Sequence, residues 1–148
     1  MNNKPFHILL ADDDESDRLL FTEAFLELNI KTIVHTVNNG IELMEWLNKE
    51  NILLPHLLFL DLNMPRKNGL QCLKEIRRNK KLRDLSIAIF STSDSEKDIE
   101  ETFLNGANVY ITKPNNFNLL KQLLEKAVMT AFQYQVQSMK RENFLLRI

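Results

Sequence analysis

Four short apolar runs in this sequence each stop at a polar residue that could take part in chemistry. Residues 8–11 lead into Asp12-Asp13-Asp14, residues 57–60 into Asp61, residues 87–90 into Ser91-Thr92, and residues 109–112 into Lys113-Pro114. If these runs are neighbouring parallel strands, their carboxyl ends lie along one edge of a sheet, which is where open α/β sheets bind ligands. Several carboxylates, a hydroxyl and an ammonium would then meet in one small region.

A group of carboxylates with one ammonium and one hydroxyl is suited to phosphoryl transfer. Carboxylates held close together repel one another, so Asp12, Asp13 and Asp61 would need a compensating cation. Oxygen ligands suit Mg²⁺, which accepts one or two carboxylates and keeps several waters. A carboxylate beside Mg²⁺ can form an aspartyl phosphate, while Lys113 and Ser91 could bind the phosphoryl oxygens. Each acid taken alone could equally be a helix cap or a loop acid, but the combination favours a site.

The residues between these sites predict an alternation of strands and helices. Strands are expected at residues 8–11, 32–36, 57–60, 87–90 and 109–111, and helices at 15–28, 41–47, 69–78, 95–104 and from 117 to about 139. In the first helix, the residues expected to face the core are Leu19, Leu20, Ala24, Phe25 and Leu28. Strands alternating with helices through short connections predict an open, doubly wound, five-stranded parallel sheet.

The bulk composition is that of one ordinary globular domain. The chain has 148 residues and a formal net charge of -1, so no global field would attract nucleic acid or an anionic membrane. A basic run (Arg77, Arg78, Lys80, Lys81 and Arg83) is most simply a solvated face. With one cysteine, no signal-like segment and no apolar run of membrane-spanning length, a cytoplasmic location is expected.

The strings at the strand ends resemble those of the response-regulator receiver family, especially its chemotaxis-type and phytochrome-associated single-domain members. The resembling strings are ILLADDD at 8–14, LLFLDLNMPRKNGL at 57–70, IAIFSTSDSEKDI at 87–99 and GANVYITKP at 106–114. The resemblance covers residues from about 6 to about 132 and implies the flavodoxin-like receiver fold with an extended C-terminal helix.

The resemblance assigns a role to each residue at the strand ends. It implies that Asp61 is the phosphoacceptor and that Asp12, Asp13 and the backbone carbonyl of Asn63 hold Mg²⁺, with Asp13 binding directly and Asp12 mainly through water. The remaining assignments are Ser91 as the switch hydroxyl, Tyr110 as the aromatic residue that rotates inward, Lys113 as the partner of Asp61 and of the phosphate, and a cis peptide bond before Pro114.

The sequence departs from the commonest pattern of the family at three positions. Ser91 stands where Thr is more frequent, Thr92 where Ala or Gly is usual, and Asp14 adds a third acid, which we expect to face solvent.

The implied function is a signalling module rather than an enzyme. It would take a phosphoryl group from a histidine kinase or phosphotransfer protein and signal to an unknown downstream protein through protein–protein contacts. Two alternatives stay open. One is a constitutive pseudo-receiver scaffold that has lost phosphorylation. The other is an aspartyl-phosphate hydrolase, which would need an acid at position 63, where this chain has Asn63.

The C-terminal part is longer than a minimal receiver requires. We divide the chain into a receiver domain at 1–132 and a helical extension with a tail at 133–148. Leu120, Leu124, Ala127 and Ala131 form a stripe expected to pack on the sheet. A second stripe (Val128, Phe132, Val136 and Met139) and the apolar tail (Phe144, Leu145, Leu146 and Ile148) would be left uncovered. These features predict a homodimer through the fifth helix and the extension, with a tail folded onto its own domain as the alternative.

Overall fold

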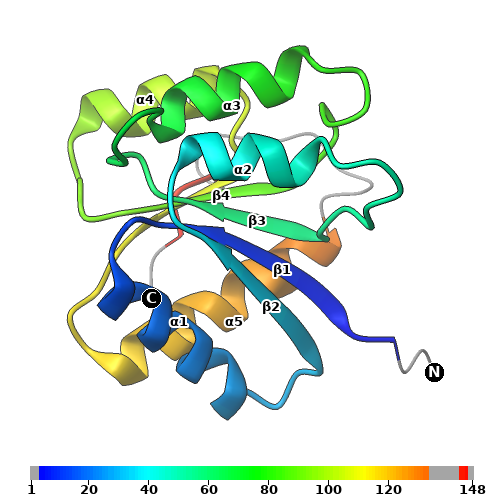
Figure 1. Cartoon of the computed structure of the whole chain (residues 1–148). Helices are drawn as coiled ribbons and strands as arrows, with labels where there is room; N and C mark the ends of the chain where they lie inside the picture. Colours follow the sequence, from blue (N-terminus) through cyan, green and yellow to red (C-terminus); the bar gives the residue numbers. More distant parts are fainter. Residues whose placement is uncertain (1–3, 134–143, 147–148) are drawn as a thin grey trace.

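The computed structural model describes residues 4–133 and 144–146, which form alternating strands and helices (Figure 1). The elements are β1 (Phe6–Ala11), α1 (Glu15–Glu27), β2 (Thr32–Val37), α2 (Gly40–Leu47), β3 (Leu57–Leu60), α3 (Gly69–Arg78), β4 (Ile87–Ser91), α4 (Glu96–Leu104), β5 (Val109–Thr112) and α5 (Phe117–Gln133). Each predicted strand and helix is present, and β3 and α3 have the predicted bounds. Among the described residues, no helix is both long enough and apolar enough to span a membrane.

The sheet is parallel throughout and has the strand order β2-β1-β3-β4-β5. Helices α2, α3 and α4 cover one face and α1 and α5 the other (Figure 1). All residues of β3 and β4 are buried, as expected for strands covered on both faces. The predicted doubly wound parallel sheet is therefore confirmed.

Strands β2, β4 and β5 each end one residue later than predicted, at the edge that carries the polar residues. The ladder between β4 and β5 continues through the pair Ser91 and Thr112, so Ser91 is the last residue of its strand rather than the first of a loop.

Helix α4 starts one residue later than predicted, because Ser95 is its N-cap and accepts a hydrogen bond from the backbone N–H of Asp98.

The predicted core face of α1 is confirmed for Ala24 and Phe25 and wrong for Leu19 and Leu20. Leu19 and Leu20 are 63% and 46% exposed, whereas Phe21 is fully buried together with Ala24 and Phe25. The aromatic side chain decides the orientation of the helix, because its ring packs edge-on against that of Phe59 in β3, with centroids 4.9 Å apart. The apolar residues of α1 lie on all sides of the helix, so their spacing alone did not identify the buried face.

The solvated-face interpretation of the basic run also fails at its first residue. Arg77 donates hydrogen bonds to the backbone oxygens of Gly106, Arg83 and Leu85 and to Oδ1 of Asn108. Its guanidinium therefore satisfies carbonyls at the ends of loops near α4 and β4. This arginine is a structural residue and not a free surface charge.

Helix α5 packs on the sheet through the predicted stripe, of which Leu120, Leu124 and Ala127 are buried. Val128, which was assigned to the uncovered stripe, is fully buried as well. The predicted continuation of the helix to about residue 139, with Val136 and Met139, lies outside the described residues.

The expectation of an uncovered tail is wrong for Phe144, which has no exposed surface. Its ring lies beside those of Phe103 in α4 and Tyr110 in β5, so this part of the tail packs on its own domain. For Phe144 the observed packing is the alternative considered from sequence, and burial of a large apolar side chain beside the open edge of β5 explains it.

Candidate functional site

The four polar strand ends meet at one edge of the sheet. β1 and β3 are neighbours, and the pair Ala11 and Leu60 ends their ladder, so that Asp12 and Asp61 follow side by side. The chain crosses from one side of β1 to the other in forming β2 and β3, which makes this edge the topological switch point of the sheet. The backbone N–H of Lys113 donates to the carbonyl of Ser91 at 2.7 Å, which holds the end of β5 against that of β4.

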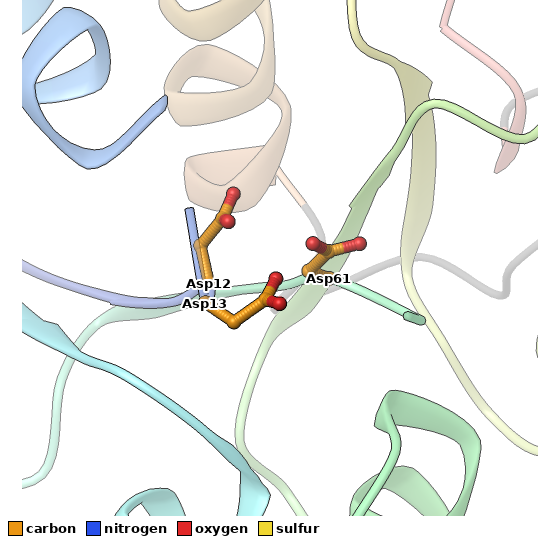
Figure 2. A group of neighbouring side chains, drawn as sticks. All are labelled: Asp12, Asp13 and Asp61. Atoms are coloured by element: carbon orange, nitrogen blue, oxygen red, sulfur yellow. The ribbon is translucent and has the colours of Figure 1, made fainter. Parts of the chain in front are cut away.

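Asp12, Asp13 and Asp61 form an acidic cluster (Figure 2), in which one carboxylate oxygen from each lies within 4.8 Å of the others. Asp12 and Asp61 are buried, while Asp13 is exposed. The cluster therefore has two buried acids, Asp12 and Asp61, and one exposed acid, Asp13, which is in contact with solvent.

A glycine allows α3 to start against the loop that carries Asp61. A Cβ atom on Gly69 would lie 2.2 Å from the carbonyl oxygen of Asp61, well inside van der Waals contact. The backbone N–H of Gly69 donates to the carbonyl of Leu62 at 3.0 Å. Gly69 therefore allows the start of α3 to lie directly against the backbone of Asp61 and Leu62.

Lys113 is shared among three carboxylates. Its Nζ lies 2.8 Å from Oδ2 of Asp12, 2.8 Å from Oδ2 of Asp17 and 3.2 Å from Oδ2 of Asp61. The predicted contact between Lys113 and Asp61 is therefore present. Asp17, on the first turns of α1, is a site residue that the sequence analysis missed.

Burial and charge perturb the ionisation of these groups. Burial raises the pKa of Asp61 from 3.8 to about 6; the ammonium of Lys113 opposes this shift and the carboxylate of Asp12 adds to it. Burial raises the pKa of Asp12 too, and the neighbouring ammonium of Lys113 opposes this shift. For Lys113, burial lowers the pKa, but contacts with Asp12, Asp17 and Asp61 outweigh it, so its pKa lies above the ordinary value. Lys113 thus stays charged at neutral pH, facing more negative charge than it can neutralise.

The donor set fits a hard divalent cation. Oδ2 of Asp12 is buried and accepts no well-aligned hydrogen bond, although it lies in ion-pair range of Lys113. Oδ1 of Asp12 accepts from the N–H of Asp14, and Oδ1 of Asp61 accepts from the N–H of Asn63 at 3.3 Å. Oxygen atoms from three carboxylates, one of them paired only with the Lys113 ammonium, are the ligands that Mg²⁺ and Mn²⁺ prefer. Asn63 itself is exposed, and its backbone carbonyl stays a predicted ligand.

Asp14 does not belong to the cluster. Its side chain is the N-cap of α1 and accepts hydrogen bonds from the N–H groups of Ser16 and Asp17. Its position at the solvent-exposed start of the helix agrees with the expectation from sequence.

The backbone of Ser93 connects Ser91 to Tyr110. Oγ of the buried Ser91 accepts a hydrogen bond from the N–H of Ser93 at 3.2 Å, and the hydroxyl of Tyr110 donates to the carbonyl of Ser93 at 2.7 Å. The ring of Tyr110 is fully buried and its hydroxyl points to the β4–α4 loop, which is the inward orientation.

The peptide bond between Lys113 and Pro114 is trans, which corrects the cis bond expected from the resemblance. A bond before proline favours trans by only about 0.5–1 kcal/mol, so sequence alone sets its isomer weakly.

Comparisons with known proteins agree with this arrangement. Residues 8–125 match the response regulator receiver domain family. The chain is 30% identical over 128 residues to response regulator Rcp1 of Synechocystis, covering 84% of this chain and 87% of Rcp1. It is also 30% identical over 125 residues to a probable methanogenesis regulatory protein, FilR2, of Methanothrix harundinacea, covering 82% and 81% of the two chains.

Solved structures show the same fold. The phosphorylated cyanobacterial phytochrome response regulator RcpA superimposes with a TM-score of 0.78 at 32% identity, covering 90% of this chain and 98% of RcpA. The Mn²⁺-bound form of Rcp1 gives a TM-score of 0.76 at 28% identity, with 92% and 99% coverage. With the acid cluster at the switch point and a match over most of its length, the chain belongs to the response regulator receiver domain family of two-component systems.

Proposed function

We propose that Asp61 accepts a phosphoryl group from a histidine kinase or phosphotransfer protein, with Mg²⁺, and that the phosphorylated chain signals through protein–protein contacts. One observation carries the proposal. The buried carboxylate of Asp61 lies 3.2 Å from the ammonium of Lys113 and within 4.8 Å of the oxygens of Asp12 and Asp13. This geometry supports the proposal that Asp61 is the nucleophile, Lys113 its counter-charge, and Asp12 with Asp13 the cation-binding pair.

The transfer would join the acidic cluster and Lys113 to a phosphohistidine of the donor protein and to Mg²⁺. A carboxylate oxygen of Asp61 forms a bond to phosphorus while the N–P bond of a phosphohistidine breaks, and the imidazole nitrogen keeps the electron pair and takes up a proton. Mg²⁺ held by Asp12, Asp13, Asp61 and the carbonyl of Asn63 would supply positive charge to the phosphoryl oxygens. Lys113 would release its other carboxylates to pair with the phosphate. The Mn²⁺-bound form of Rcp1 and the phosphorylated form of RcpA support this chemistry by similarity.

The switch would consist of Ser91 and Tyr110. A phosphoryl oxygen on Asp61 would accept a hydrogen bond from the Ser91 hydroxyl, which is buried at the end of the neighbouring strand. This interaction exists only in the phosphorylated state, so it shifts the balance between conformations of the β4–α4 loop and Tyr110.

A cytoplasmic location, an unidentified downstream protein and a homodimer through α5 complete the proposal. Sedimentation at high micromolar concentration, with and without beryllofluoride, tests the homodimer.

A constitutive scaffold is the alternative, and one experiment separates the two. The chain is incubated with acetyl phosphate and Mg²⁺ and its intact mass is measured. A receiver gains one phosphoryl mass, and both Asp61→Asn and a chelator abolish the gain. Asp94→Asn, which removes an exposed acid outside the cluster, serves as a matched control that keeps it. An unchanged wild-type mass favours the scaffold, and labelling that survives Asp61→Asn contradicts the phosphoacceptor assignment.

A further inference from the structure

The C-terminal segment Phe144–Leu146 lies along the open edge of the sheet. β5 is an edge strand, and Leu145 forms a parallel bridge with Tyr110 in that strand. The N–H of Leu146 donates to the carbonyl of Tyr110 at 3.2 Å. The segment therefore extends the sheet at one residue, and that residue is the proposed switch tyrosine.

The side chains of this segment contact both faces of the sheet. Phe144 is fully buried, with its ring centroid 5.2 Å from that of Phe103 and 6.1 Å from that of Tyr110. Leu145 packs against the same core as Phe144, whereas Leu146 packs against the core on the α1–α5 side. Contacts on two faces and a backbone hydrogen bond make this a specific docking of the segment on β5.

A continuous set of contacts joins this segment to the acidic cluster. Ser91 accepts from the N–H of Ser93, the carbonyl of Ser93 accepts from the hydroxyl of Tyr110, and the ring of Tyr110 contacts Phe144. The ring of Tyr110 has no exposed surface, so an outward rotation must displace what covers it, and Phe144 is part of that cover. The docked segment therefore favours the inward orientation of Tyr110 over an outward one.

We propose that the segment Phe144–Leu146 is an intramolecular ligand of β5 whose docking and the occupation of the phosphoryl site stabilise each other through the inward Tyr110. This inference rests on the proposed function, because it takes Ser91 and Tyr110 as the switch. Coupling between two sites is reciprocal. Phosphoryl-site occupancy must tighten the docking by the same factor by which the docking tightens the phosphoryl site.

Hydrogen exchange of the Leu146 amide in the full-length protein tests one direction of this coupling. Beryllofluoride with Mg²⁺ is the probe, since it imitates the phosphoryl group. We expect it to slow the exchange of this amide by roughly five- to 150-fold, the range typical of coupled sites. The slowing should not depend on protein concentration, because the segment binds its own chain.

Phe144→Ala in the full-length protein tests the reverse direction. Its affinity for beryllofluoride should fall by a similar factor. Leu104→Ala is the matched control, since it removes an apolar side chain that is 71% exposed on the adjacent helix α4, and its affinity should stay at the wild-type value. If Phe144→Ala folds poorly, the exchange measurement on the wild-type protein still tests the coupling, because it needs no substitution.

The outcomes separate this inference from the proposed function. If beryllofluoride binds, but the exchange of Leu146 and the affinity of Phe144→Ala are unchanged, the coupling is absent and the receiver function stands. Faster exchange would mean that the segment opposes phosphorylation, and a slowing that grows with protein concentration would mean that it binds a second copy. Either result overturns the inference. If beryllofluoride fails to bind, the proposed function falls and the inference falls with it.

Discussion

Nζ of Lys113 lies closer to Oδ2 of Asp17, at 2.8 Å, than to Oδ2 of Asp61, at 3.2 Å. Asp17 thus competes with the proposed phosphoacceptor for the ammonium that a phosphoryl group would need. The side chain of Asp17 is 32% exposed, so its ion pair is partly screened by solvent.

We predict that Asp17→Asn raises the affinity for beryllofluoride and the rate of labelling by acetyl phosphate. Lys113 would be free to pair with the phosphoryl group, and one negative charge that repels it would be removed. A partly exposed ion pair of about 0.2–1 kcal/mol corresponds to roughly a one-and-a-half- to fivefold increase. Titration of the full-length protein with beryllofluoride measures it.

Glu15→Gln is the control for Asp17, because it removes an equal charge from the first turn of the same helix. The control should change the affinity by less than Asp17→Asn does. A lower affinity in Asp17→Asn would show instead that Asp17 positions Lys113 for the phosphoryl group.

The metal site gives a second prediction, in which two adjacent acids behave differently. Asp13→Asn should weaken Mg²⁺ binding on the order of tenfold or more, because it removes a negatively charged ligand from the cluster. Asp14→Asn should leave the affinity nearly unchanged, since Asp14 caps α1 and asparagine caps a helix about as well. Isothermal titration of both proteins decides the matter, and equal losses would mean that the cation is held differently.

The raised pKa of Asp61 predicts how the stability of the metal-free protein depends on pH. Asp61 binds its proton more tightly in the folded state, with a pKa of about 6, than in the unfolded chain, near 3.8. The favourable contribution of this protonation to the free energy of unfolding is therefore complete below about pH 3.8. It is lost as the pH rises through about 6. Above that range the buried carboxylate destabilises the fold by at most roughly 3 kcal/mol.

Asp61→Asn should accordingly raise the free energy of unfolding at pH 7.5 in the presence of a chelator, and by progressively less as the pH falls toward 4. Urea denaturation across this range measures the difference. Glu23→Gln, which removes an exposed carboxylate of α1, should show no such trend. A stabilisation by Asp61→Asn that is the same at pH 4 and pH 7.5 would exclude burial of the charge as its cause.

Much of the site could be predicted from sequence because it lies at strand ends. A buried parallel strand is a short apolar run, and the first polar residue after it marks the sheet edge. Asp12, Asp61 and Lys113 each follow such a run, and Ser91 differs only in closing its strand. The order of the runs was enough to bring these residues together.

Asp17 was missed for the same reason that Leu19 and Leu20 were wrongly assigned to the core. Residues four apart lie on the same face of a helix, so the buried Phe21 implies that Asp17 faces the sheet edge one turn earlier. The sequence offered Leu19 and Leu20 as alternatives to Phe21, and only the packing of the ring against Phe59 decides between them. Docking of Phe144 on β5 likewise depends on contacts between residues far apart in the chain, which local periodicity does not encode.

The last prediction concerns the switch hydroxyl. Ser91→Ala should still bind beryllofluoride at Asp61, but the binding should change the NMR signals of the Tyr110 ring much less than in the wild type. Ser91 is fully buried, and its Oγ is the acceptor for the N–H of Ser93, whose carbonyl receives the Tyr110 hydroxyl. Removing Oγ breaks this connection and also deletes the hydrogen bond that only a phosphoryl group can receive, so the two states of the loop are no longer distinguished. Ser91→Thr keeps the hydroxyl and should restore the response, while Thr92→Ala changes an exposed neighbour and should leave it intact. Equal ring shifts in Ser91→Ala and the wild type would show that the signal reaches Tyr110 by another route.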